Sequence, residues 1–127
     1  MLVLLDTTVL IDHLCGRPAV ARVDRLLRDG ATVATTAINV EEVVRGMRNT
    51  ERGVVDDLLA GLVVVPIGEA AARQAGAWRA EYASRGTTLH QADCLIAAAA
   101  EVHGGRLCTG NPEDFPMISV EHWPVGE

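Results

Sequence analysis

Short apolar runs alternate with helix-like patterns along the whole chain. Residues 3–5 form a continuous apolar run typical of a buried strand, and the next segment has a helical pattern that Gly16 and Pro18 stop. Residues 91–105 are apolar on nearly all sides, as expected of a buried helix. We expect strands within residues 3–5, 31–36, 63–66, 107–109 and 118–123, and helices within residues 7–18, 19–30, 38–49, 51–62, 69–86 and 91–105.

This order of elements predicts the fold class. Strands that alternate with helices favour an α/β fold, in which helices cover both faces of a mainly parallel sheet of four to five strands. The chain of 127 residues contains no linker, low-complexity segment or internal repeat, so we expect one domain spanning residues 1–127. In such sheets, ligands bind beyond the carboxyl ends of the strands.

Composition limits the core and the compartment. The chain has two Trp, one Tyr and one Phe, so its core must be aliphatic. No apolar run approaches the roughly 20 residues of a membrane span, and the first residues lack the basic region of a signal peptide. The three widely spaced cysteines, Cys15, Cys94 and Cys108, are expected to be reduced thiols of a cytoplasmic protein.

The charge balance excludes several classes of function. A formal net charge of −6 argues against a protein held on nucleic acid by bulk charge, but permits an acidic site filled by cations or a basic partner. All eleven basic residues are arginine, so any mechanism that needs a lysine is excluded. This argues against P-loop enzymes, and against the receiver and phosphatase classes that also place acids beyond parallel strands.

The first candidate acid, Asp6, stands where the first strand ends. Aspartate is common there as a turn former, and Thr7 and Thr8 could cap the next helix. Glu42 lies within a predicted helix, four residues before Gly46, whose small size suggests a close approach of that helix to the sheet edge. Alternatively, Glu42 is a solvated surface charge, as we expect for its neighbour Glu41, which can pair with Arg45.

Two further acids stand near the starts of later helical segments. Asp93 lies in the first turn of the apolar helix, where a carboxylate also favours the helix dipole. Asp114 follows the fourth strand in "TGNPEDF". A local explanation exists there too, with Asn111 as helix cap, Pro112 as the first helical residue and Asp114 as the acid of a capping box.

Each acid is ambiguous alone, and the argument for a site lies in their combination. Asp6, Glu42, Asp93 and Asp114 all fall at one inferred edge of the sheet. Several carboxylates within a few ångströms repel one another, and a divalent cation removes that repulsion. An all-oxygen donor set suits Mg²⁺ or Mn²⁺, which takes one or two carboxylates directly while other acids act through water. The sequence therefore predicts a metal site that can activate water.

The motifs, taken in order, resemble those of the PIN domain. They are "LLDTTVLID" near the start, "EVVRG" and "DCLIAAAA" on helices, and "CTGNPEDF" near the end. The resemblance spans almost the whole chain, and it is closest to the VapC-type ribonuclease toxins of bacterial type II toxin–antitoxin pairs. One small departure is Cys94, where alanine is usual after the third acid.

The resemblance implies a three-layer α/β/α sandwich, usually a homodimer, and a cytoplasmic Mg²⁺-dependent endoribonuclease, with Mn²⁺ as a substitute. A cognate VapB-type antitoxin would block the site in a heteromeric complex. The family's acidic quartet maps onto Asp6, Glu42, Asp93 and Asp114, with Asp6 and Asp93 holding the metal. Its polar companions map onto Thr8, Thr109 and Asn111. Asn111 and Asp114 compete for the fourth role, and we favour Asp114 as the acid and Asn111 as its support.

An RNA substrate would need cationic contacts despite the negative net charge. Arginine suits bidentate phosphate contacts, and we expect Arg17 and Arg45, from two arginine-rich stretches, to supply them, although each can equally be an exposed helix-face charge. The alternative function is a non-enzymatic RNA-binding or regulatory module of the same fold, whose acids serve only as caps.

Overall fold

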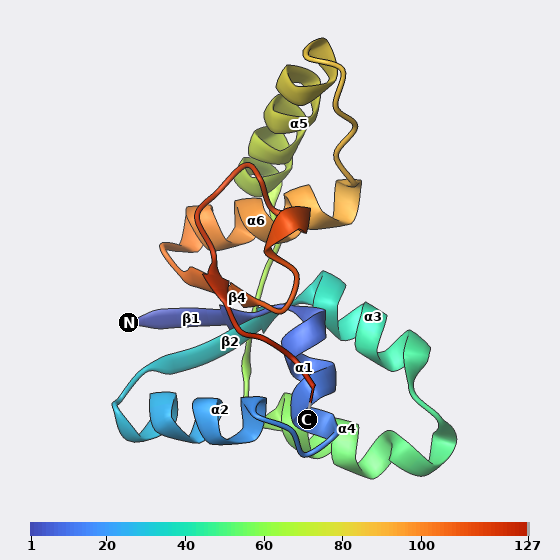
Figure 1. The fold of residues 1–127 in the computed structure, drawn as a ribbon, viewed down its shortest axis with the longest axis vertical. Coiled ribbons are helices and arrows are strands. Elements are labelled where there is room, and N and C mark those ends of the chain that lie inside the picture. Colours follow the sequence, from blue (N-terminus) through green and yellow to red (C-terminus); the bar gives the residue numbers. More distant parts are fainter. Residues whose placement is uncertain (127) are drawn as a thin grey trace.

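A five-stranded sheet forms the centre of the computed structural model, which describes residues 1–126 (Figure 1). The strand order is β3-β2-β1-β4-β5, and every pairing is parallel. The strands are β1 (Leu2–Leu5), β2 (Thr32–Thr36), β3 (Val63–Val65), β4 (Arg106–Thr109) and β5 (Glu121–His122). The helices are α1 (Thr7–Leu14), α2 (Ala19–Arg28), α3 (Ala37–Gly46), α4 (Arg52–Ala60), α5 (Glu69–Ser84) and α6 (Gln91–His103), with short 3₁₀ turns η1 (Asn49–Glu51) and η2 (Pro112–Asp114).

Alternation along β1 explains the layers on the two sides of the sheet. Val3 and Leu5 pack into a core with buried residues of α1, α2, α3 and α4, whereas Leu4 faces the opposite way and packs against α6. Figure 1 shows α5 and α6 on one side of the sheet and α1, α2 and α4 on the other. The predicted α/β/α sandwich around a parallel sheet is therefore confirmed.

The apolar helix α6 is buried as its sequence predicted. Its four consecutive alanines, residues 97–100, are at most 1% exposed, because α6 lies between the sheet and α5. Ala98 and Cys94 pack towards Ala71 and Ala75 of α5, where small side chains let the two helices approach closely. Within residues 1–126, no helix is long and apolar enough to cross a bilayer.

Three local predictions differ from the structure. The last strand covers only Glu121–His122, because Ile118 closes a turn onto the carbonyl of Phe115 instead of extending from residue 118. The turn η1 was not expected. Gly46 does not mark a close approach to the sheet: it is the exposed last residue of α3, and a Cβ added there would meet open space, so the reason inferred for a glycine at this position is wrong.

Candidate active site

The carboxyl ends of β1, β2 and β4 meet at one edge of the sheet, because these three strands are parallel neighbours. Asp6 follows β1, and its backbone N–H donates to the carbonyl of Cys108 in β4 at 3.0 Å. Helix α3, which carries Glu42, starts directly after β2, and the turn η2, which carries Asp114, follows β4. Chain order therefore brings three of the four predicted acids to this edge.

Asp6 is held by side chains from three segments. Thr109 and Thr8 donate to Oδ2 at 2.7 and 3.2 Å, and the amide of Asn39 donates to Oδ1 at 3.3 Å. Asp6 occupies the cap position of α1 but makes no capping hydrogen bond, so the interpretation as a helix cap or turn former is wrong. Asp6 is only 6% exposed. Three donors reach its carboxylate, which has about four acceptor sites.

The threonines that hold Asp6 also fix the loop after β4. Thr8 Oγ1 accepts the backbone N–H of Gly110 at 2.8 Å, and Thr109 Oγ1 accepts that of Asn111 at 3.0 Å. Gly110 must stay small, because a Cβ there would lie 2.6 Å from Val125 and 3.3 Å from Thr8. The hydroxyls of Thr8 and Thr109 thus align the strand end that leads to Asp114.

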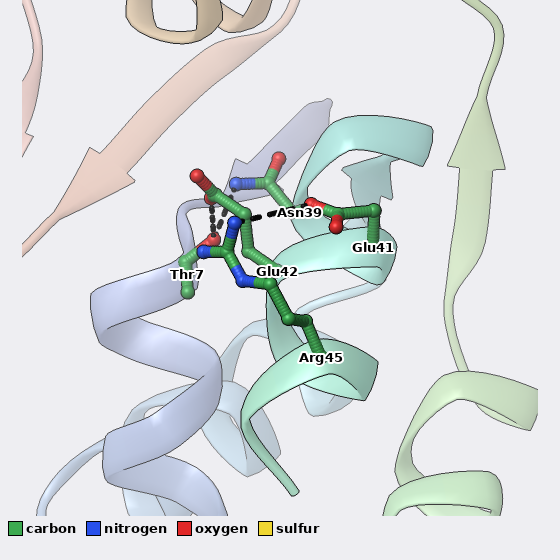
Figure 2. Close-up of polar contacts among 5 residues, drawn as sticks. All are labelled: Thr7, Asn39, Glu41, Glu42 and Arg45. Atoms are coloured by element: carbon green, nitrogen blue, oxygen red, sulfur yellow. Dashed lines mark hydrogen bonds and ion pairs between the residues drawn. The ribbon is translucent and has the colours of Figure 1, made fainter.

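Glu42 is not a free surface charge. Thr7 donates to Glu42 Oε1 at 2.6 Å, and Asn39, one turn earlier on α3, donates to Thr7 Oγ1 at 2.9 Å (Figure 2). The interpretation of Glu42 as solvated is therefore wrong, and so is that of Thr7 and Thr8 as helix caps. Glu41 does lie outward, 62% exposed and 3.9 Å from Arg45, as predicted.

Asp114 and Asn111 form a pair. Asn111 precedes η2 as expected and Pro112 begins it, but the Asn111 side chain does not cap the turn. Its amide instead donates to Asp114 Oδ2 at 2.8 Å, so the predicted capping box is absent. This arrangement favours Asp114 as the acid and Asn111 as the residue that orients it.

Asp93, in the first turn of α6, completes the group. The pKa of Asp93 is raised from 3.8 to about 6, first by burial and then by the charges of Asp114 and Asp6, with a smaller contribution from Glu42, whereas His90 lowers it. The three other acids therefore lie close enough to act on the Asp93 carboxylate. Between residues 1 and 126, no hydrogen bond or ion pair is found for the Asp93 carboxylate.

The donor set fits a hard divalent cation. In the described part of the chain, no ion pair includes any of the four acids, although five arginines pair with carboxylates elsewhere. In the same residues, no three His, Cys, Asp or Glu side chains are placed to hold one ion directly. The oxygens available at this edge are carboxylate oxygens, the donors that Mg²⁺ takes in proteins, where it binds one or two carboxylates and keeps several waters.

The raised pKa of Asp93 predicts a pH-dependent stability of the metal-free protein. Because the folded state holds the Asp93 proton more tightly than the unfolded chain does, the free energy of unfolding should fall as pH rises from about 4 to about 6. In EDTA at pH 7.5, Asp93→Asn should therefore melt a few degrees above wild type. Thermal unfolding at pH 4 and 7.5 measures this, and an Asp93→Asn gain equal at both pH values would contradict it.

The two arginines predicted to contact RNA are both exposed, Arg17 after α1 and Arg45 near the end of α3. Figure 2 shows the Arg45 side chain extending along α3 to pair with Glu41. Its pairing with Glu41 is long and exposed, which leaves the guanidinium available to a phosphate beside Glu42.

Sequence reasoning missed Thr7 and Asn39 as members of the site. Asn39 is fully buried, and it forms a capping box with Thr36 at the start of α3. A signal was present: Asn39 stands three residues before Glu42, a spacing that places both side chains on one helical face. Thr7 gave no signal of its own beyond its place beside Asp6.

Comparisons with known proteins agree with this geometry. The family model for the PIN domain matches residues 3–118. The chain is 38% identical over 119 residues to ribonuclease VapC10 of Mycobacterium tuberculosis, covering 92% of this chain and 88% of that protein. It is 33% identical over 116 residues to ribonuclease VapC19 of the same species, covering 91% and 93%.

Solved structures give the same picture. A chain of DNA-bound VapBC from Salmonella typhimurium has a TM-score of 0.81 and 30% identity, over 97% of this chain and 99% of that chain. VapBC-1 from nontypeable Haemophilus influenzae has a TM-score of 0.78 and 25% identity, over 97% and 96%. The matches extend over nearly the full length of each chain.

Proposed function

The chain belongs to the PIN-domain family, and from that premise we propose that it is a Mg²⁺-dependent endoribonuclease, the toxin of a toxin–antitoxin pair. The curated relatives are named ribonucleases, and the similar solved structures include VapBC proteins and a toxin–antitoxin complex from Klebsiella pneumoniae. One observation carries the proposed metal dependence: Asp114, Asp6 and Glu42 all act on the Asp93 carboxylate at a sheet edge where, within residues 1–126, no arginine pairs with them.

Each side chain has a role that its surroundings support. Asp6 and Asp93 would hold the ion, because Asp6 is rigidly oriented and because, among residues 1–126, no hydrogen-bond or ion-pair partner is found for the Asp93 carboxylate. Glu42 and Asp114, each oriented by one donor, would bind water at the rim. When bound, Mg²⁺ would activate a water and neutralise phosphate charge in an in-line displacement. Arg45 would contact a neighbouring phosphate of the RNA.

An apolar groove beside Glu42 supports the other part of the proposal, that a protein inhibitor binds this chain. The groove encloses about 260 Å³ between α1, α3 and α4, and Glu42 lies at its edge. Ile11 and Val54, which line it, are 49% and 58% exposed, so a large apolar area faces solvent. We propose that the cognate VapB-type antitoxin binds this groove, where a bound chain would also cover Glu42.

A homodimer and a cytoplasmic location, both implied by the family resemblance, remain predictions. Sedimentation of the purified protein measures the first, and cell fractionation measures the second. Neither is needed for the cleavage that is proposed.

The proposed cleavage is tested by incubating the purified protein with a mixture of total RNA and sequencing the new 5′ ends. We expect defined cuts with Mg²⁺ or Mn²⁺ and none in excess EDTA. Cleavage that persists in EDTA would contradict the metal dependence. Binding of RNA without any cleavage under every metal condition would instead favour the non-enzymatic RNA-binding module.

A further inference from the structure

Asn39 and Thr7 connect two carboxylates that come from different parts of the chain. Asp6 ends β1, whereas Glu42 lies one turn into α3, and no hydrogen bond joins them directly within residues 1–126. Asn39 reaches both Asp6 and Thr7. Thr7 in turn reaches Glu42, and Figure 2 shows the contacts from Asn39 to Thr7 and from Thr7 to Glu42. Two uncharged side chains therefore bridge the two charges.

The direction of each hydrogen bond in this bridge follows from the donors available. The backbone N–H of Thr36 can only donate, and it reaches Asn39 Oδ1 at 3.3 Å, so Oδ1 is the acceptor and Nδ2 the donor of that amide. The Thr36 hydroxyl also reaches Oδ1, at 2.7 Å. Asn39 thus uses both oxygen lone pairs on Thr36 and both amide protons on Asp6 and Thr7.

This assignment also orients Thr7. Its hydroxyl must accept from Asn39 Nδ2, so its single proton is left for Glu42 Oε1 at 2.6 Å, the short distance expected when a carboxylate accepts. Thr7 is the first residue of α1, and within residues 1–126 the hydrogen bonds found for its hydroxyl are those with Asn39 and Glu42. The order of donation therefore runs from Asn39 to Thr7 to Glu42.

We propose that Thr7 and Asn39 are positioning residues, a one-way hydrogen-bond relay that sets the orientation of the Glu42 carboxylate relative to Asp6. The inference rests on the proposed function. Because Thr7 occupies Oε1, the relay holds the other oxygen, Oε2, in one direction for water or substrate. The relay also places hydrogen-bond donors between the Asp6 and Glu42 carboxylates, which would otherwise repel each other. A flexible surface glutamate would escape that repulsion by turning outward.

The test replaces the Thr7 hydroxyl with a methyl group and keeps the shape of the side chain. Thr7→Val removes the donor to Glu42, whereas Thr7→Ser keeps it, and Thr32→Val makes the same exchange at an exposed site on β2. Mutating a residue that orients a metal ligand typically lowers activity or metal affinity by roughly 10–100-fold. We expect Thr7→Val to lose that much kcat with little change in KM, and to weaken Mn²⁺ binding measured by calorimetry. Thr7→Ser should restore both, and Thr32→Val should match wild type.

A double-mutant cycle separates positioning through Glu42 from a general structural role. If Thr7 acts through Glu42, adding Thr7→Val to Glu42→Ala should cost no further activity or Mn²⁺ affinity. A full additional loss, or a single Thr7→Val variant that cleaves like wild type, would overturn the relay. Failure of the proposed function looks different, because wild-type protein would then neither bind Mn²⁺ nor cleave RNA.

Discussion

Replacing Asp6 with asparagine should lower RNA cleavage by roughly 10²–10³-fold, the size expected when one preorganised electrostatic group is lost. The variant removes the charge of the most strongly oriented carboxylate of the site. The fold should survive, because the hydroxyls of Thr8 and Thr109 can rotate to accept from the new amide. Cleavage rates with Mg²⁺, together with circular dichroism, measure the two effects.

Asp24→Asn is the matched control, because Asp24 is an exposed aspartate of α2 remote from the sheet edge. It should cleave like wild type. Asp93→Asn should lose cleavage as Asp6→Asn does, while gaining thermal stability in EDTA. Unchanged cleavage in a protein that carries both Asp6→Asn and Asp93→Asn would refute the assigned roles.

Placing an arginine in the apolar groove should release the protein from its inhibitor. Val54→Arg puts a charge where an apolar partner surface would be buried, so affinity for the co-expressed antitoxin should fall at least about 30-fold, the loss typical of an interface hot spot. Cleavage without antitoxin should stay unchanged, because Val54 lies on α4 and the acids do not.

Val102→Arg is the control for this change, since Val102 is 49% exposed at the end of α6 and does not line the groove. Calorimetry with the purified antitoxin, and inhibition of RNA cleavage by it, measure the effect. Equal loss of affinity in both variants, or no loss in Val54→Arg, would show that the antitoxin covers another surface.

Patterning along the chain was sufficient for the fold because each element carries its own signal. A strand buried on both faces must be continuously apolar, as residues 3–5 are. A helix between the sheet and another helix needs small apolar side chains, as at residues 97–100. The four acids could also be selected, since parallel strands place their carboxyl ends at one edge.

Sequence could not distinguish the two buried aspartates of "DTTVLID". Asp12, 2% exposed, accepts the backbone N–H groups of Ala19 and Gly126 and so joins the start of α2 to the end of the chain. Asp6 accepts from side chains at the strand edge instead. Whether a buried carboxylate is structural or belongs to a site depends on which donors surround it, and these come from residues far along the chain.

By itself, the sequence determined the elements, their parallel order and the edge where acids gather, because hydrophobic periodicity and chain order are local properties. Only the tertiary structure decided that Thr7 bonds Glu42 instead of capping its helix, and that Gly46 borders a groove instead of touching the sheet. Hydrogen-bond partners and open space are set by segments that meet only after folding, so no pattern within one segment records them.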